Sequence, residues 1–274
     1  MGRHTGVWSS SLDRTVEKNK IRIQSKQTKQ PPFTAHRSLK SQPLKPPGQP
    51  DIRVRMTVAE MATGDLLVVA PVAPTGEALA MLRGLGSGVV RHIVVPNTSP
   101  EHYLFTPAFA AAWPDATVWL PPGFLVGAGT PLPGRSWLFG ACRARCRELG
   151  VDALPAELVG ELEAVVLRIT LFLEAAILLP RHSALCLADT AVCLSASDPE
   201  YATMNAWLAR KIGVYDRLGP ITGEALRARP AEARAWATAV LARDFELVVP
   251  AHGSAPVRGG RAAFEDCFAF VLGE

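Results

Sequence analysis

The chain has 274 residues, of which 48% are apolar, so it can bury a substantial core in one large domain or two small ones. Its net charge of +4 is unevenly distributed, because residues 1–50 carry ten Lys or Arg and two acids, which leaves residues 51–274 with a net charge of −4. The pI of 8.9 therefore describes the N-terminal segment and gives no support for a nucleic-acid partner. No uncharged apolar run of about 18 residues occurs, so no transmembrane segment is expected.

Residues 1–50 are rich in Ser, Thr, Gln, Lys and Pro and contain few large apolar side chains. Such a segment cannot bury enough surface to offset the loss of chain entropy, so we expect a disordered basic leader. A basic N-terminus with many hydroxyl groups and few acids is also typical of an organelle transit peptide. The composition leaves both interpretations open.

The folded part, residues 52–274, begins with strands and helices in alternation, a pattern that indicates an α/β fold. A helix capped by Thr75 and ended by Gly84 is expected, and a short helix is expected at Pro107–Trp113. The expected strands are Val54–Val58, Leu66–Val72, Arg91–Val95 and Asp115–Leu120.

The second half of the folded part predicts consecutive antiparallel strands and then mainly helices. His182 falls in a turn between two of these strands and is expected to be solvated. The expected strands are Ala164–Leu171, Phe172–Leu179, Ala184–Ala188 and Phe245–Val249. The expected helices are Tyr201–Val214, Thr222–Ala228, Ala231–Ala242 and Arg261–Leu272. Residues 123–160 are rich in Gly and Pro and predict no clear element.

Four residues share one position in this pattern, since each lies just beyond a short apolar strand: Glu101, His102, Asp189 and His252. In layered α/β structures, side chains from several strand ends point into one crevice, where ligands collect. Two imidazoles and two carboxylates are suitable ligands for zinc, iron or manganese. A metal ion held in this way can lower the pKa of a bound water toward ~7 and polarise a carbonyl or phosphoryl oxygen.

Each of these four residues also has a plain structural explanation. A single His at a strand end is often a hydrogen-bonded structural residue. Asp189 can cap the segment that follows it, and Glu101 can form an ion pair with a nearby Arg such as Arg91. Other catalytic motifs are absent, because no Gly-x-Ser-x-Gly elbow occurs and the Gly-rich segment 84–88 precedes a strand instead of following one.

Seven segments carry a resemblance to a known family: Arg55–Val58, Pro71–Pro74, Arg91–Pro96, Glu101-His102, Phe109–Trp119, Leu187–Asp189 and Pro250–Pro256. In this order they resemble a plant, algal and bacterial family, known as a domain of unknown function, within the metallo-beta-lactamase superfamily. The resemblance covers residues 52–274. It implies a four-layered αββα sandwich with a metal site at one rim of its two sheets.

The superfamily's signature, H-x-H-x-D-H after a strand, is degenerate in the matching segment. Asn97 and Ser99 stand where the first two His would be, Glu101 replaces the Asp, and His102 matches the last His. The superfamily uses a further His, a bridging Asp and a final His later in the chain. Asp189 and His252 match the last two of these by resemblance.

The resemblance places no imidazole at the position of the further His, where Glu174 is the only polar group nearby. The site normally built from three imidazoles has therefore lost its ligands, whereas the neighbouring site keeps them. We expect one zinc, iron or manganese ion at Glu101, His102, Asp189 and His252, which would activate water to hydrolyse a small-molecule ester, thioester or phosphodiester. Asn97 or Ser99 would contact substrate or water.

The alternative is a catalytically silent scaffold of the same fold that acts as a binding or interaction protein. Its motivation is the pair Asn97 and Ser99 at two positions where imidazole ligands would stand. The family's plant and algal members are generally thought to be plastid proteins. A transit-peptide leader would accordingly place this protein in the chloroplast, and a plain leader would leave it cytoplasmic.

Overall fold

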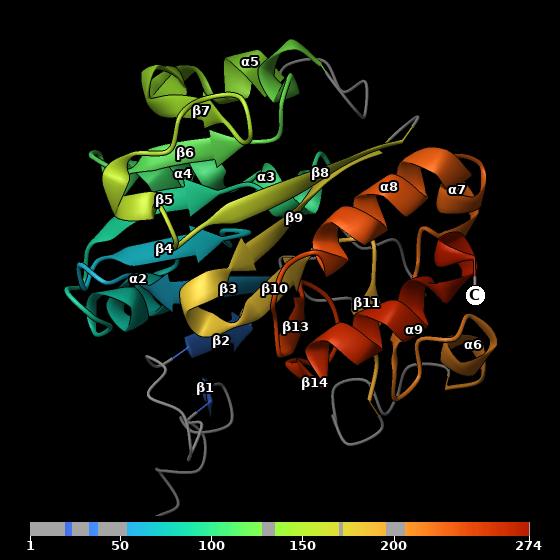
Figure 1. The fold of residues 1–274 in the computed structure, drawn as a ribbon. Helices are drawn as coiled ribbons and strands as arrows, with labels where there is room; N and C mark the ends of the chain where they lie inside the picture. Colours follow the sequence, from blue (N-terminus) through green and yellow to red (C-terminus); the bar gives the residue numbers. More distant parts are fainter. Residues whose placement is uncertain are drawn as a thin grey trace, which may run out of the picture.

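The computed structural model describes residues 20–23, 33–37, 54–127, 135–169, 172–195 and 206–273. Figure 1 shows two large sheets at the centre, with helices on their outer sides. This arrangement is a four-layered αββα sandwich, as the resemblance noted in the sequence implies. Within the described residues, every helix is too short or too polar to span a lipid bilayer.

The first sheet has seven strands in the order of the sequence. They are β1 (Lys20–Ile23), β2 (Phe33–Arg37), β3 (Arg55–Glu60), β4 (Leu66–Val69), β5 (Val90–Val94), β6 (Thr117–Leu120) and β7 (Cys146–Glu148). Strands β4 to β7 pair in parallel, and parallel neighbours need crossover connections. The connection from β4 to β5 carries α2 (Gly76–Arg83), and the connection from β5 to β6 carries α3 (Pro100–Tyr103) and α4 (Thr106–Ala111).

The second sheet has five strands in the order β14-β13-β10-β9-β8. They are β8 (Glu163–Ile169), β9 (Phe172–Leu179), β10 (Ala184–Leu187), β13 (Leu247–Pro250) and β14 (Val257–Arg258). Only β10 and β13 pair in parallel, so their carboxyl ends lie at the same edge of the sheet. A small third sheet pairs β11 (Val192–Cys193) with β12 (Leu218–Gly219).

The remaining helical elements are mostly short. They are α5 (Arg135–Leu138), α6 (Ala206–Lys211), α7 (Gly223–Arg227), α8 (Pro230–Leu241), α9 (Gly260–Leu272), and the 3₁₀ turns η1 (Phe124–Val126), η2 (Gly140–Arg145), η3 (Ala156–Leu158) and η4 (Pro180–His182). The longest two, α8 and α9, cover the outer face of the second sheet, where Trp236 and Phe264 pack with their rings 5.7 Å apart.

Successive side chains along each strand point to opposite faces of the sheet, and this alternation divides the core into three layers. In β4, Leu66 and Val68 face α2 and α4 on the outside, whereas Leu67 and Val69 face the second sheet. In β9, Ile177 faces the first sheet. All four β4 residues are buried because both faces of the sheet are covered, which explains why this strand is apolar throughout.

Thr75 caps α2 as the sequence predicts, because its hydroxyl oxygen accepts a hydrogen bond from the Ala78 N–H at 3.2 Å. We expect Thr75→Ala to lower the free energy of unfolding by about 1 kcal/mol, since it leaves this N–H without its side-chain acceptor. Thr75→Ser keeps the oxygen and should change stability by only a few tenths of a kcal/mol. Urea denaturation compares the two variants, and an equal loss in both would refute a role for the hydroxyl.

Two segments of the N-terminal leader differ from the disorder expected from composition. β1 and β2 pair antiparallel, and β2 pairs with the edge of β3. The physical reason is that an edge strand presents unpaired N–H and C=O groups to which another segment can add. The rest of residues 1–50 lies outside the described residues, and the role of the leader as a transit peptide stays a prediction.

Other local expectations need correction. β4 ends at Val69, three residues early, because Ala70 adopts a positive φ of 54°. His182 is buried, with its Nε2 3.0 Å from the Glu60 carbonyl, so the prediction of a solvated turn residue is wrong. α6 covers only the middle of the expected helix Tyr201–Val214, and residues 196–205 lie outside the described part of the chain.

Candidate metal centre

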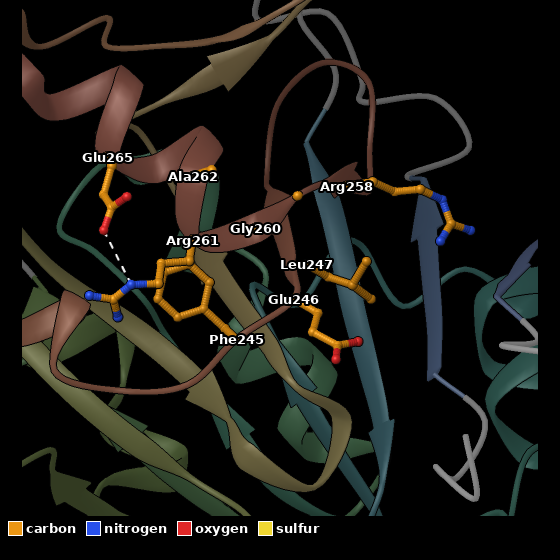
Figure 2. Close-up of a pocket in the computed structure, with 9 residues that line it drawn as sticks. Phe245, Glu246, Leu247, Arg258, Gly260, Arg261, Ala262 and Glu265 are labelled. Carbon is orange, nitrogen blue, oxygen red and sulfur yellow. Dashed lines mark ion pairs between the residues drawn. The ribbon is translucent and has the colours of Figure 1, made fainter. Parts of the chain in front are cut away.

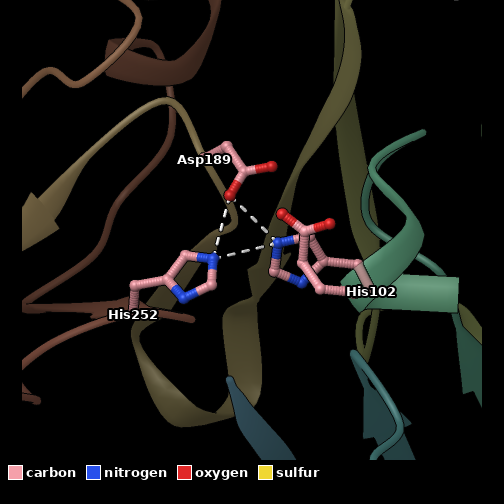
Figure 3. A group of neighbouring side chains, drawn as sticks. His102, Asp189 and His252 are labelled. Atoms are coloured by element: carbon pink, nitrogen blue, oxygen red, sulfur yellow. Dashed lines mark hydrogen bonds and ion pairs between the residues drawn. The ribbon is translucent and has the colours of Figure 1, made fainter. Parts of the chain in front are cut away.

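Three loops meet at one rim of the sandwich, each of them following the carboxyl end of a strand (Figure 3). The loop after β5 leads into α3, which begins after Ser99 with Pro100 at its first position and carries Glu101 and His102. The loop after β10 carries Asp189, and the loop after β13 carries His252. The structure thus brings together the four residues that the sequence singles out as ligand candidates.

The side chains of three of these residues converge on one point. Asp189 Oδ1 lies 3.1 Å from His102 Nε2 and 2.9 Å from His252 Nε2. The two Nε2 atoms are 3.3 Å apart, and all three side chains are buried. Glu101 is exposed at the edge of the group, with its carboxylate within 4.8 Å of the other ligand atoms.

These distances fit a single metal ion. An ion bound tetrahedrally at ~2.0–2.1 Å separates its ligand atoms by about 3.3–3.5 Å. The observed spacings of 2.9 to 3.3 Å are slightly shorter than these values. Three lone-pair atoms this close repel one another unless a cation lies among them, so the site requires either a shared proton or a metal.

The charges of the group favour a cation. Burial acts to lower the pKa of His102, but the charge of Asp189 and its hydrogen bond outweigh burial and raise this pKa above the usual value. Burial acts to raise the pKa of Asp189, yet His102 and His252 hold it well below the usual value. Asp189 is therefore a carboxylate at neutral pH, and it supplies the negative charge that a metal ligand needs.

Asn97 has a different place from the one expected. It is fully buried, its Nδ2 donates to Asp189 Oδ2 at 2.6 Å, and its Oδ1 accepts the Ser99 N–H at 2.9 Å. Both ends of the amide are thus engaged within the protein, so the expectation that Asn97 contacts substrate or water finds no support in this geometry. Instead Asn97 holds the second oxygen of Asp189.

Glu174, to which the sequence assigns no role, contacts the loop that carries Asp189. This fully buried carboxylate in β9 accepts hydrogen bonds from the backbone of Ala188, Asp189 and Thr190. Burial, and next the charge of Asp189, raise the pKa of Glu174, while these N–H groups and the Thr190 hydroxyl oppose the shift. The available sequence signal was one acid inside the apolar run Phe172–Leu179.

Arg55 at the start of β3 holds the loop that carries His252. Its backbone N–H donates to the Ala251 carbonyl, and its guanidinium donates to the carbonyls of Pro250 and Gly253. Gly253 has a φ of +81°, and a Cβ there would lie 2.0 Å from the Cys193 carbonyl oxygen. The close approach of the two backbones therefore requires glycine directly after His252.

The plain structural explanation for Glu101 is not borne out. Arg91, its suggested partner, pairs instead with Asp65, with Nε 3.1 Å from Oδ2. Glu101 accordingly remains available at the rim of the group. Among the described residues, this group is the one cluster of His, Cys, Asp and Glu side chains with a geometry suited to a metal ion.

A separate cavity of about 540 Å³ lies at the opposite end of β13 (Figure 2). Leu247, the first residue of β13, lines it, whereas His252 follows the last residue of that strand. None of the four candidate ligands contributes to the lining, which comes from residues 245–247 at the start of β13, from residues 258–259 and from the first two turns of α9. The cavity is therefore distinct from the metal centre.

The sandwich has the metallo-beta-lactamase fold, and the cluster lies at its rim. The chain is similar to DIM-1 metallo-beta-lactamase exposed to ceftazidime, with a TM-score of 0.55 at 13% identity over 93% of this chain and 97% of that one. The chemotaxis sensor ODP, solved as a peroxy diiron species, has a TM-score of 0.53 at 11% identity over 83% and 88%.

A third similar structure is the metal-soaked Flv1 flavodiiron core from Synechocystis sp. PCC6803. Its TM-score is 0.57 at 13% identity, and the match covers 88% of this chain but only 59% of that one. At identities this low, the structural similarity establishes the shared fold and nothing more. A comparison with curated protein sequences found no match.

The chain belongs to the family described as domain of unknown function DUF4336, whose model matches residues 49–212. The matched range includes Asn97, Glu101, His102 and Asp189, and it ends before His252. The family assignment agrees with the resemblance noted from the sequence.

Proposed function

We propose that this protein is a metal-dependent hydrolase that holds one zinc, iron or manganese ion at Glu101, His102, Asp189 and His252. The observation that carries this proposal is the convergence of Asp189 Oδ1 and two imidazole Nε2 atoms within 3.3 Å of one another. Such a set of lone pairs at the rim of this fold suits a first-row metal.

The hydrogen bond of Asn97 supports one metal rather than two. A carboxylate commonly bridges two metal ions by binding one with each oxygen, and this mode of bridging needs both oxygens free. Here Asp189 Oδ2 accepts the Asn97 amide N–H at 2.6 Å, so only Oδ1 is available for a metal. Glu174 offers no replacement ligand, because four donors already engage its two oxygens.

A metal ion bound at this site would supply Lewis acidity and lower the pKa of a coordinated water to ~7. The residues of the chain supply the rest. Asp189 and the two buried imidazoles fix the position of the ion, and Glu101 is the member that solvent and substrate reach. We propose that the substrate is a small ester, thioester or phosphodiester and that Glu101 would ligate the metal.

The metal content of the purified full-length chain tests the proposal. After exposure to zinc, manganese or iron(II) and removal of excess metal, we expect about one equivalent in the wild type. In His102→Ala/His252→Ala we expect less than about a tenth of an equivalent, because two of the three buried ligands are gone. Elemental analysis measures both, and a panel of ester, thioester and phosphodiester substrates then tests turnover by the loaded enzyme.

The alternative function is a silent scaffold whose polar groups bind one another. The hydrogen bonds of Asp189 to His102, His252 and Asn97 are the observation that favours it. A metal-free wild type whose melting temperature does not respond to added metal would support this alternative and refute the metalloenzyme.

A further inference from the structure

Glu174 lies within β9, an otherwise apolar strand, and its side chain is fully buried. A charged carboxylate is costly at such a position unless hydrogen bonds compensate it. Four donors surround it, and all of them come from the segment that follows β10. This concentration of donors on one short loop shows what the carboxylate does in the fold.

The carboxylate of Glu174 holds both sides of Asp189. Its Oε1 accepts the Ala188 N–H at 2.9 Å and the Thr190 hydroxyl at 2.6 Å. Its Oε2 accepts the Asp189 N–H at 2.8 Å and the Thr190 N–H at 3.1 Å. Three consecutive backbone N–H groups thus donate to one carboxylate. These hydrogen bonds fix the backbone at Asp189 and therefore the direction in which its side chain points.

The same stretch of β9 holds the loop that follows β5. The Ala175 N–H donates to the Pro96 carbonyl at 2.7 Å, and the Thr98 N–H donates to the Leu173 carbonyl at 3.1 Å. Asn97 therefore forms an isolated bridge with Glu174 itself. Because Asn97 in turn donates to Asp189 Oδ2, the residues around Glu174 in β9 hold two of the three loops of the metal centre, those after β5 and β10.

We propose that Glu174 is a positioning residue for the metal centre. Glu174 holds Asp189 in the orientation that directs Oδ1 at the two histidines. This inference rests on the proposed metal site. Only a carboxylate suits the position, because an amide of the same shape would present an N–H₂ group to N–H donors. Glu174→Gln would therefore keep the volume while forcing the loop 188–190 to move.

The test measures zinc affinity of the full-length chain by competition with a chromogenic chelator. We expect Glu174→Gln to weaken binding by about 10–100-fold, the usual effect of removing a group that orients a ligand. It should also alter the visible absorption of the cobalt(II)-loaded protein, which reports ligand geometry. Thr190→Val removes one of the four donors and leaves Glu174 in place, so it should weaken binding by only about fivefold.

Glu161→Gln is the matched control. Glu161 is also a buried acid that accepts a backbone N–H, from Ala62 at 2.8 Å, but it contacts none of the candidate ligands. We expect this variant to lower the melting temperature while leaving zinc affinity within about twofold of wild type.

The outcomes separate this inference from the proposed function. A wild-type chain that binds none of zinc, manganese and iron(II) would overturn both. A wild type that binds zinc, with equal affinity in Glu174→Gln, would overturn the positioning role alone. Equal weakening in Glu161→Gln and Glu174→Gln would also overturn it, since the effect would then be general destabilisation. Thr190→Val supplies the same comparison where Glu174→Gln fails to fold, and unchanged affinity and cobalt spectrum in Thr190→Val would contradict the proposal.

Discussion

Asp189→Asn is expected to abolish metal binding, from about one equivalent in the wild type to less than about a tenth. The structure gives a specific reason beyond the loss of charge. Asn97 Nδ2 faces one oxygen of Asp189, so the carbonyl of an introduced amide would turn toward it. The amide N–H₂ would then point at His102 Nε2 and His252 Nε2 and fill the position of the ion.

Asp65→Asn is a suitable control for this variant. Asp65 also accepts two side-chain hydrogen bonds, from Ser87 at 2.8 Å and from Arg91 at 3.1 Å, but it is not among the candidate ligands. Metal content of both variants is measured by elemental analysis, and full occupancy of Asp189→Asn would remove Asp189 from the ligand set.

The pH dependence of the metal-free protein provides a second measurement on the same variant. The pKa of His102 is raised in the folded state, so its contribution to stability is present below its unfolded pKa of about 6.5 and is lost as the pH rises through the folded value. In Asp189→Asn the largest charge that raises this pKa is absent. Burial, which has the largest effect and lowers the pKa, is then opposed only by the charges of Glu101 and Glu174. We therefore expect the dependence to reverse, with stability lost as the pH falls, in thermal melts between about pH 5 and pH 9.

Arg55→Ala is expected to lower the free energy of unfolding by about 2–5 kcal/mol. Its guanidinium donates to the Pro250 and Gly253 carbonyls, and the side chain is 2% exposed. Truncation would leave two buried carbonyls without these donors, at about 1–3 kcal/mol each. Because these carbonyls flank His252, zinc affinity should fall together with stability.

Arg217→Ala, which truncates an arginine at the surface, is the control for Arg55→Ala. Arg217 pairs with Asp266 at 2.8 Å, but its side chain is 53% exposed and that of Asp266 is 66% exposed. Removing a pair of this kind changes stability by about 1 kcal/mol or less. Urea denaturation should separate the two arginine variants clearly, and a similar small loss in both would mean that the guanidinium of Arg55 is dispensable.

Much of the fold follows from local patterns in the sequence. The apolar run Leu66–Val72 and the Thr75 cap predict a strand–helix unit, and the structure has both, with the strand ending at Val69. Pro230 predicts the break before α8, because proline suits the first turn of a helix and not its interior. Boundaries were less predictable, since the end of β4 depends on the positive φ of Ala70 and not on hydrophobicity.

The candidate ligands were also accessible from the sequence, because each of them follows an apolar strand. What the pattern did not reveal is the set of residues that hold them. Asn97 and Asp189 are 92 residues apart, and Glu174 meets Asp189 only through the antiparallel register of β9 and β10. His182 likewise becomes buried because its turn packs on the Glu60 carbonyl of the other sheet.

The sequence by itself therefore determined most of the strands and helices, the α/β class of the fold and the polar residues at the strand ends. Hydrophobic periodicity carries this information, since it records which face of each segment is buried. The tertiary structure alone decided that two imidazoles and one carboxylate meet, that Asn97 takes the second oxygen of that carboxylate, and that Glu174 and Arg55 hold the loops. Those partnerships depend on strand register and loop path, and a pattern of apolar residues within one segment specifies neither.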